Sequence, residues 1–140
     1  MLRFGTLLMV FLLLTACDVS TTGSSESGCS LSDGRRAFDA LNSVAQEWDD
    51  AVKLAGQTTR ITIAPQIASL QGIRRTVQQQ NWPSCAQPVQ QSFIAYMDEM
   101  INGYLAFMGN APEAEYQGHF DKAHQLLSTF REEMSKLSAQ

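Results

Sequence analysis

The chain has 140 residues, with 14 acidic side chains against 10 basic ones and a formal net charge of −4 at pH 7. This balance argues against general nucleic-acid binding, which needs a basic surface. The length fits a leader and one domain with a real hydrophobic core, but not two such domains.

The first sixteen residues have the layout of a secretory signal peptide. One basic side chain precedes an apolar run from Leu7 to Leu14, and the small pair Thr15-Ala16 follows. The run is too short to span a bilayer as a helix, and the small residues suit a cleavage site. Residues 1–16 are therefore left out of the expected fold. Without the basic side chain of this leader, nine basic residues face 14 acidic ones, a net charge of −5.

Cys17 follows the leader directly, in the sequence L-L-T-A-C. These residues, Leu13 to Cys17, resemble the lipobox of bacterial lipoproteins. The resemblance implies that the Cys17 sulfur carries a diacylglycerol and that cleavage makes Cys17 the first mature residue. Two or three acyl chains, at roughly 0.8 kcal/mol for each buried CH₂, anchor a protein durably. The alternative is an ordinary signal peptide with a free or oxidised Cys17, which leaves an odd thiol in an exported protein.

Residues 17–31 are expected to form a lipidated tether. From Asp18 to Gly28 the chain is polar and rich in Gly, Ser and Thr, a composition typical of flexible linkers, with a reach on the order of 20 Å. In enteric-type envelopes, Asp18 after the cysteine resembles a signal for staying in the inner membrane. The expected location is the periplasm or the outer face of the cytoplasmic membrane, with the outer membrane as the alternative.

Four segments with helical periodicity follow the tether, at approximately 32–56, 64–81, 84–108 and 112–138. In the first, apolar residues recur at steps of three and four, as on one face of an amphipathic helix. They are Phe38, Leu41, Ala45, Trp48, Val52 and Ala55. Ser32 or Asp33 can cap the start of this helix. In the second segment Pro65 fits the first turn, and the inner face is Ile67, Leu70, Ile73 and Val77.

The third segment opens with Ser84-Cys85-Ala86-Gln87, which matches an S-x-x-Q capping box, and Gly109-Asn110 close it. Its apolar stripe is Val89, Phe93, Met97, Met100, Tyr104 and Phe107. In the last segment apolar residues follow at alternating steps of four and three, a heptad pattern. They are Tyr116, Phe120, Ala123, Leu127, Phe130, Met134 and Leu137.

Four helices with short connections and no convincing strand predict an all-α fold, an up-down-up-down four-helix bundle. Ile61-Thr62-Ile63 is the one β-like stretch, and it is too short and isolated to build a sheet. The heptad pattern of 112–138 leaves a coiled-coil dimer open as an alternative. A monomer is favoured because four helices in one chain can cover one another.

Cys29 and Cys85 are expected to form a disulfide. In this topology the first and third helices start at the same end, where Cys29 precedes one and Cys85 opens the other. Compartments outside the cytoplasm permit disulfides, and closing a loop of about 57 residues stabilises a fold by roughly 4 kcal/mol. The alternative is two unpaired, partly buried cysteines.

Charges are distributed unevenly along the predicted bundle. Basic side chains gather toward the end with the tether: Arg35, Arg36, Arg74, Arg75 and Lys136. Acidic side chains gather toward the other end: Glu47, Asp49, Asp50, Glu113 and Glu115. Helix dipoles explain part of this distribution, but not two arginines at the start of the first helix. The four arginines are therefore candidates for contact with anionic headgroups at the membrane surface.

No catalytic or metal-binding motif stands out. The sequence lacks G-x-S-x-G, a phosphate loop, H-E-x-x-H and C-x-x-C-H, and the cysteines are assigned to lipid and disulfide. Glu115, His119 and His124 do not make the paired Glu-x-x-His motifs of di-iron bundles. Asp98 and Glu99 are interpreted as the solvated side of the third helix. We expect no enzymatic activity, no metal and no cofactor beyond the covalent lipid on Cys17.

The general layout resembles small, functionally uncharacterised bacterial lipoproteins with an all-helical, disulfide-linked domain, a resemblance that implies no functional residues. The first hypothesis is a non-enzymatic, membrane-tethered module that binds a protein partner or another component of the cell envelope. The second is a carrier or sensor of a small apolar ligand, held between the helices by aromatic and Met side chains. Such side chains can also simply fill an irregular core.

Overall fold

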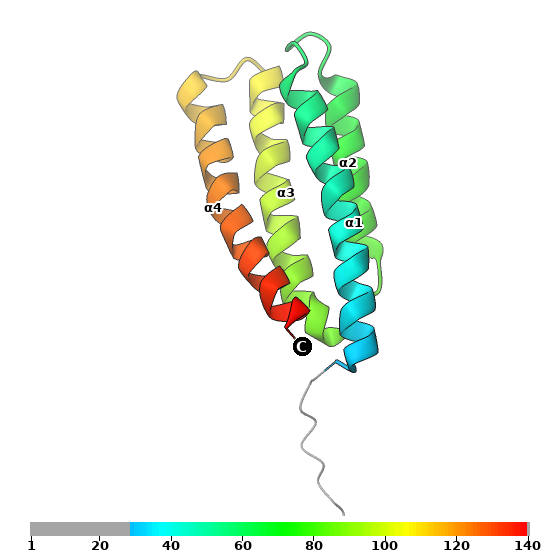
Figure 1. Ribbon diagram of the computed structural model, residues 1–140. Coiled ribbons are helices and arrows are strands. Elements are labelled where there is room, and N and C mark those ends of the chain that lie inside the picture. Colours follow the sequence, from blue (N-terminus) through cyan, green and yellow to red (C-terminus); the bar gives the residue numbers. More distant parts are fainter. Residues whose placement is uncertain (1–28, 140) are drawn as a thin grey trace, which may run out of the picture.

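Residues 29–139 are described by a computed structural model, in which four helices run alternately up and down (Figure 1). The helices are α1 (Leu31–Gly56), α2 (Ala64–Gln79), α3 (Gln87–Met108) and α4 (Glu113–Ser138), with a 3₁₀ turn, η1 (Ser84–Ala86), before α3. The predicted all-α, up-down-up-down bundle is confirmed. We call the end that holds the start of α1, η1 and the end of α4 the Cys29 end, and the opposite end the far end.

The leader 1–16, Cys17 and the tether up to Gly28 lie outside the described residues. Between Cys29 and Ala139, none of the helices combines the length and the apolar character that a membrane crossing requires.

The Cys29–Cys85 disulfide is confirmed, with the two Cα atoms 5.5 Å apart. It joins the residue before α1 to η1, so the point where the described chain begins is tied to the start of the third helix. The predicted capping box at this place is wrong. Ser84 lies inside η1, and α3 begins without a side-chain cap. The reason is Pro88, which lacks an N–H and occupies the first turn of α3, so that the preceding residues form a separate 3₁₀ turn.

Of the other helix ends, Gly56, Ala64, Met108 and Ser138 are as predicted, whereas the starts of α1 and α4 and the end of α2 differ by one or two residues. The N-cap of α1 is Ser30, whose Oγ accepts a hydrogen bond from the N–H of Asp33 at 3.1 Å. Helix α2 ends at Gln79, because the Trp82 indole N–H donates to the Val77 carbonyl at 2.8 Å and occupies the last turn. At the far end, Asn110 takes the left-handed conformation, with φ 61°, that ends α3.

The core lies along the bundle axis and is filled by side chains from all four helices, with large aromatic rings from α1, α3 and α4. Trp48 of α1 is fully buried and meets the rings of Phe93 and Tyr96 of α3 edge-on. Phe93 also stacks on Phe130 of α4, with the ring centres 4.4 Å apart. Burial of one such side chain contributes about 1.5–3 kcal/mol. The middle of the bundle is therefore filled by side chains, and the hollows described below lie between helices at the surface.

Candidate functional site

Two rows of half-buried apolar side chains lie opposite each other on α1 and α4, and we call this region the α1–α4 seam. Each row repeats every seven residues, so its members lie on one side of their helix. The rows are Phe38, Ala45 and Val52 on α1, and Phe120, Leu127 and Met134 on α4. The neighbouring heptad rows are buried: Leu41, Trp48 and Ala55 on α1, and Ala123, Phe130 and Leu137 on α4.

Helix α4 packs closely on α3 because α3 has no side chain at Gly103. A Cβ at this position would lie 2.5 Å from the Phe120 ring, closer than real atoms approach. The glycine therefore lets the ring lie directly on the α3 backbone. Figure 1 shows the consequence, since α4 follows α3 along its length and stands apart from α1 toward the far end.

Polar contacts hold the other edge of α4 to α3. The Nζ of Lys122 donates to Oε1 of Glu99 at 2.6 Å, and Nδ1 of His119 lies 2.8 Å from Oε2. A carboxylate only accepts, so the His119 nitrogen is the donor. The Glu99 side chain is 14% exposed. The hydrogen bonds from Lys122 and then from His119 hold the pKa of this carboxyl below its usual value of 4.5.

A second ion pair crosses from α2 to α3. The Arg74 guanidinium donates to both carboxylate oxygens of Asp98, at 2.7 and 3.0 Å. This carboxylate raises the pKa of Arg74 above its usual value. The interpretation of Asp98 and Glu99 as a purely solvated face is therefore wrong. Both residues link helices, and their partners come from segments 20 or more residues away, which helical periodicity does not reveal.

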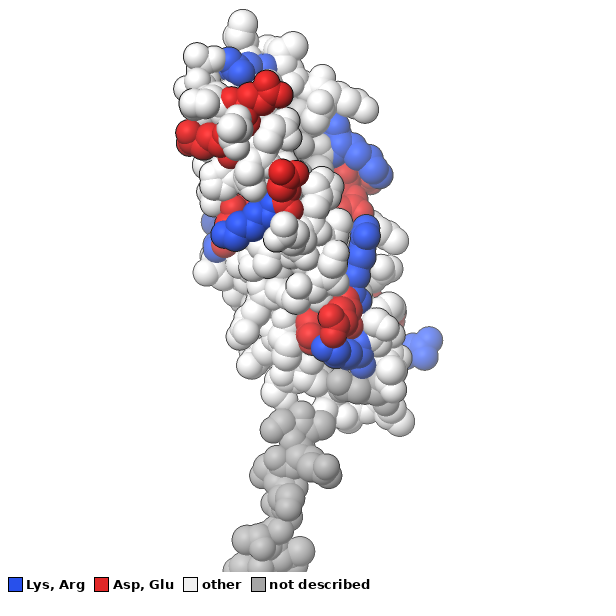
Figure 2. Space-filling model, turned by 90° about the vertical axis from the view of Figure 1, so that its left-hand side faces the viewer, with Lys and Arg blue, Asp and Glu red and all other residues white. Residues whose placement is uncertain are grey.

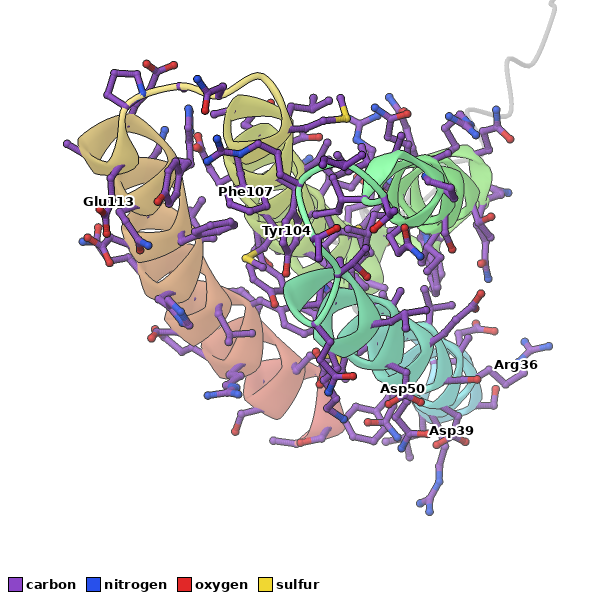
Figure 3. All side chains as sticks on the ribbon, turned by 90° about the horizontal axis from the view of Figure 1, so that it is seen from above. Arg36, Asp39, Asp50, Tyr104, Phe107 and Glu113 are labelled. Atoms are coloured by element: carbon purple, nitrogen blue, oxygen red, sulfur yellow. A yellow bond between two sulfur atoms is a disulfide. The ribbon has the colours of Figure 1, made fainter. Side chains whose placement is uncertain are left out.

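The seam opens into a hollow of about 520 Å³ near the far end, the far hollow. Aromatic rings from α3 and α4 form much of its wall. Tyr104 and Phe120 pack edge-on with centres 5.1 Å apart, as do Phe107 and Tyr116 at 5.6 Å. The full lining is Val52, Ala55, Gly56, Thr58, Met100, Tyr104, Phe107, Tyr116, Gln117, Phe120 and His124. Seen from the far end, Tyr104 and Phe107 lie where α3 faces α4 and α1 (Figure 3).

Two contacts fix the walls of the far hollow. The Tyr104 hydroxyl donates to the Val52 carbonyl of α1 at 3.1 Å, and burial raises the pKa of this phenol above 10. Arg60, from the loop between α1 and α2, lies over the Phe107 ring at 4.8 Å and donates to the Asn110 side chain. The aromatic walls are thus set before any ligand arrives.

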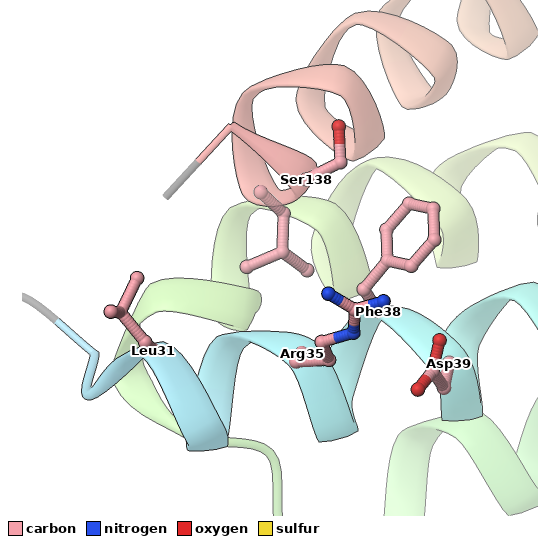
Figure 4. A pocket seen from close by; sticks show the side chains of 6 residues that line it. Leu31, Arg35, Phe38, Asp39 and Ser138 are labelled. Atoms are coloured by element: carbon pink, nitrogen blue, oxygen red, sulfur yellow. The ribbon is translucent and has the colours of Figure 1, made fainter.

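Two further hollows continue the seam toward the Cys29 end. The middle hollow, about 390 Å³, includes Phe38, Ala45 and Met134 from the two half-buried rows. The near hollow, about 460 Å³, is lined by Leu31, Arg35, Phe38, Asp39, Leu137 and Ser138 (Figure 4). Phe38 and Ser138 line both. The three hollows therefore follow one another along the same pair of helices.

Of the four arginines that the sequence suggests for membrane contact, two form ion pairs within the described residues and two do not. Arg36 pairs with Asp33, and Arg74 is held by Asp98. Within residues 29–139, Arg35 and Arg75 make no ion pair; Arg35 lines the near hollow, and Arg36 lines a separate hollow between α1 and the segment before η1. Figure 3 shows Arg36, Asp39 and Asp50 on the side of α1 that faces away from α3.

Acidic side chains gather near the far end on the side that α4 covers, where Glu113 and Glu115 form its first turn (Figure 2). Closer to the Cys29 end, Lys136 lies between Glu132 and Glu133, at 2.8 Å from each. The predicted separation of charge therefore holds at the start of α4, while at its end the basic side chain is matched by two acids.

No group of three or more His, Cys, Asp or Glu side chains between Cys29 and Ala139 is placed to hold a metal ion. His119 binds Glu99, whereas His124 lines the far hollow. The chain matches no protein-family model, and comparison with curated proteins and with solved structures found no match. The sequence did not reveal the seam, because a heptad stripe shows which positions are apolar but not how far a neighbouring helix covers them.

Proposed function

We propose that this protein is a membrane-tethered, non-enzymatic binding module of the cell envelope, and that the α1–α4 seam binds an amphipathic helix of a partner protein. The observation that carries the proposal is the pair of half-buried heptad rows with hollows between them. The tether part rests on the lipobox-like sequence that ends at Cys17.

The spacing of the seam fits a helix better than an extended peptide. A helix-in-groove partner presents large apolar side chains at i, i+3 or i+4, and i+7. The α1 row from Phe38 to Val52 covers 14 residues, or about 21 Å of helix. A partner helix of about four turns would therefore place one large side chain in the far hollow and one in the middle hollow. Its polar face would remain in solvent.

Photo-crosslinking at the seam tests this proposal. p-Benzoylphenylalanine replaces Asn42, which lines the middle hollow, or Gln117, which lines the far hollow; both residues are exposed. The matched control is the exposed Ala68 on α2. In cells that make the native lipoprotein, the first two positions should give the same adduct, and Ala68 should not.

Mass spectrometry of the adduct supplies the decisive result. Gln117 lines the same hollow as Gly56, 14 residues beyond Asn42 on α1. The two crosslinks should therefore fall about 14 residues apart in one amphipathic helix of the partner. Adducts equal to those of the Ala68 control, or crosslinks to an extended or wholly polar segment, would overturn the proposal.

The far hollow supports a second candidate function, the binding of a small apolar ligand. Its volume of about 520 Å³ lies within the usual range of roughly 300–1,000 Å³ for small-molecule sites. Native mass spectrometry of protein purified from its own membranes should then show a co-purified mass. Phe120→Ala should release that ligand while the surface variant Gln79→Ala keeps it. A single unliganded mass in gentle detergent contradicts this candidate.

A further inference from the structure

We propose that the near hollow binds an anionic phospholipid of the host membrane and docks the Cys29 end of the bundle on the bilayer surface. The lipid phosphate would lie against the Arg35 guanidinium, and the glycerol and upper acyl chain against Leu31, Phe38 and Leu137. This inference rests on the proposed lipid anchor at Cys17. It concerns a site at the opposite end of the seam from the far hollow.

The hollow combines an apolar floor with one basic group at its edge. Leu31 and Phe38 project from α1 toward Ser138 of α4, and the Arg35 side chain lies between them (Figure 4). Leu31 is 76% exposed. An exposed leucine beside an arginine suits an amphiphile with a negative headgroup, because the apolar part of the ligand contacts the leucine and the negative headgroup contacts the guanidinium.

Arg35 is the basic side chain that lines the near hollow, whereas Arg75 and Arg131, which also make no ion pair in residues 29–139, do not line it. The neighbouring cations Arg36 and Lys136 are paired with acids. Arg35 makes no ion pair in residues 29–139. The planar guanidinium donates to two phosphate oxygens at once, which favours a phosphate over a single carbonyl oxygen. Asp39 is the one acid in the lining, and its charge opposes the same ligand.

The position of the hollow in the chain places it at the membrane. Leu31 comes two residues after Cys29, which the disulfide fixes to η1. The twelve peptide links from Cys17 to Cys29 span at most about 43 Å. A lipid on Cys17 therefore keeps the Cys29 end within that distance of the bilayer. Docking at the near hollow would turn this loose attachment into a fixed orientation.

Fluorescence quenching by brominated lipids tests the proposal on the full-length acylated protein in vesicles. Leu31→Trp places a reporter at the near hollow, and Ile61→Trp places the same reporter at the far end, where Ile61 is 94% exposed. The native residues Trp48 and Trp82 are buried and are present in both variants. Brominated phosphatidylglycerol should quench the reporter at position 31 but leave the reporter at position 61 nearly unquenched. Neutral brominated phosphatidylcholine should quench both weakly.

A second set of variants separates docking from mere nearness to the anchor. In the Leu31→Trp background, Arg35→Gln should lower the ratio of docked to undocked protein about fivefold on anionic vesicles. Arg36→Gln, next to it but already paired with Asp33, should change the ratio little, and Asp39→Asn should raise it. Equal losses for Arg35→Gln and Arg36→Gln would show a diffuse charge effect and overturn the lipid site. So would equal quenching by the two lipids.

The two proposals fail independently. Arg35→Gln leaves Asn42 and Gln117 in place, so the crosslinks to a partner helix should persist in this variant. Loss of quenching with intact crosslinks counts against the lipid site alone, whereas intact quenching without crosslinks counts against the partner helix alone.

Discussion

The two apolar rows of α4 belong to the same heptad repeat but differ in burial. In one row, Ala123, Phe130 and Leu137 are buried. In the other row, Phe120, Leu127 and Met134 are half-buried, and Phe120 both rests on the α3 backbone at Gly103 and lines the far hollow beside α1. The first row is part of the interior, and the second borders the seam. A regular apolar repeat therefore does not by itself say which of its rows a neighbour will cover.

The difference arises from how closely each pair of helices can approach. A missing Cβ and a half-buried ion pair draw α4 onto α3. Against α1, by contrast, bulky side chains such as Phe38 and Met134 meet near a hollow. Helix α4 contacts α3 much more extensively than α1, so the α1–α4 interface is the more open of the two. The open one is where binding of a partner costs the fold least.

The largest contrast should appear when one phenylalanine is removed from the interior and one from the seam. Phe130→Ala deletes a ring that is 6% exposed and stacked on Phe93, and should lower the free energy of unfolding by about 3–5 kcal/mol. Phe38→Ala deletes a half-buried ring of the seam and should cost about 1–2 kcal/mol. Urea denaturation of both variants measures the difference. Equal costs would show that the seam is as well packed as the interior.

A methyl group added to α3 at Gly103 should disrupt the close packing of α4 on α3. Gly103→Ala directs a Cβ into the Phe120 ring, so α4 must shift, and the free energy of unfolding should fall by about 1–3 kcal/mol. The matched control is Gly118→Ala on α4, where nothing lies within 4 Å of the new Cβ. This control should raise stability by up to about 1 kcal/mol, because alanine favours a helix.

Both glycine variants are measured by the same urea denaturation. If Gly103→Ala were as stabilising as Gly118→Ala, the close approach of α4 to α3 would not depend on the absent side chain.

The smallest expected effect on the free energy of unfolding concerns the polar contacts of Glu99 between α3 and α4, and it depends on pH. Glu99→Gln removes the carboxylate that binds His119 and Lys122, and should cost about 1 kcal/mol at pH 7. Because folding lowers the pKa of Glu99 from 4.5, its contribution is complete above that value. The contribution is lost as the pH falls through the lowered pKa.

Thermal unfolding at several pH values checks this sign. The gap between wild type and Glu99→Gln should be constant above about pH 5 and should narrow in acid. Asp98→Asn serves as the comparison, since it removes an ion pair between α2 and α3 and leaves the α4 contact in place. A gap that widens in acid would contradict the assignment.

Local sequence rules predicted much of this fold and failed where distant segments compete. The four helices follow from apolar residues at steps of three and four, and the Cys29–Cys85 disulfide follows from topology once the helices are counted. The capping box at Ser84 failed because Pro88 occupies the first turn of α3 and the residues before it form a separate 3₁₀ turn. Asp98 and Glu99 were misread because the cations that bind them come from α2 and α4.

The amino-acid sequence by itself determined the helical segments, their order and the pairing of two cysteines, because these depend on spacing along the chain. The tertiary structure alone decided which apolar rows are covered, since burial depends on how closely two helices approach. At Gly103 that approach is set by one absent Cβ atom. The α1–α4 seam and its three hollows are the result of packing, and they hold the surfaces proposed here for binding.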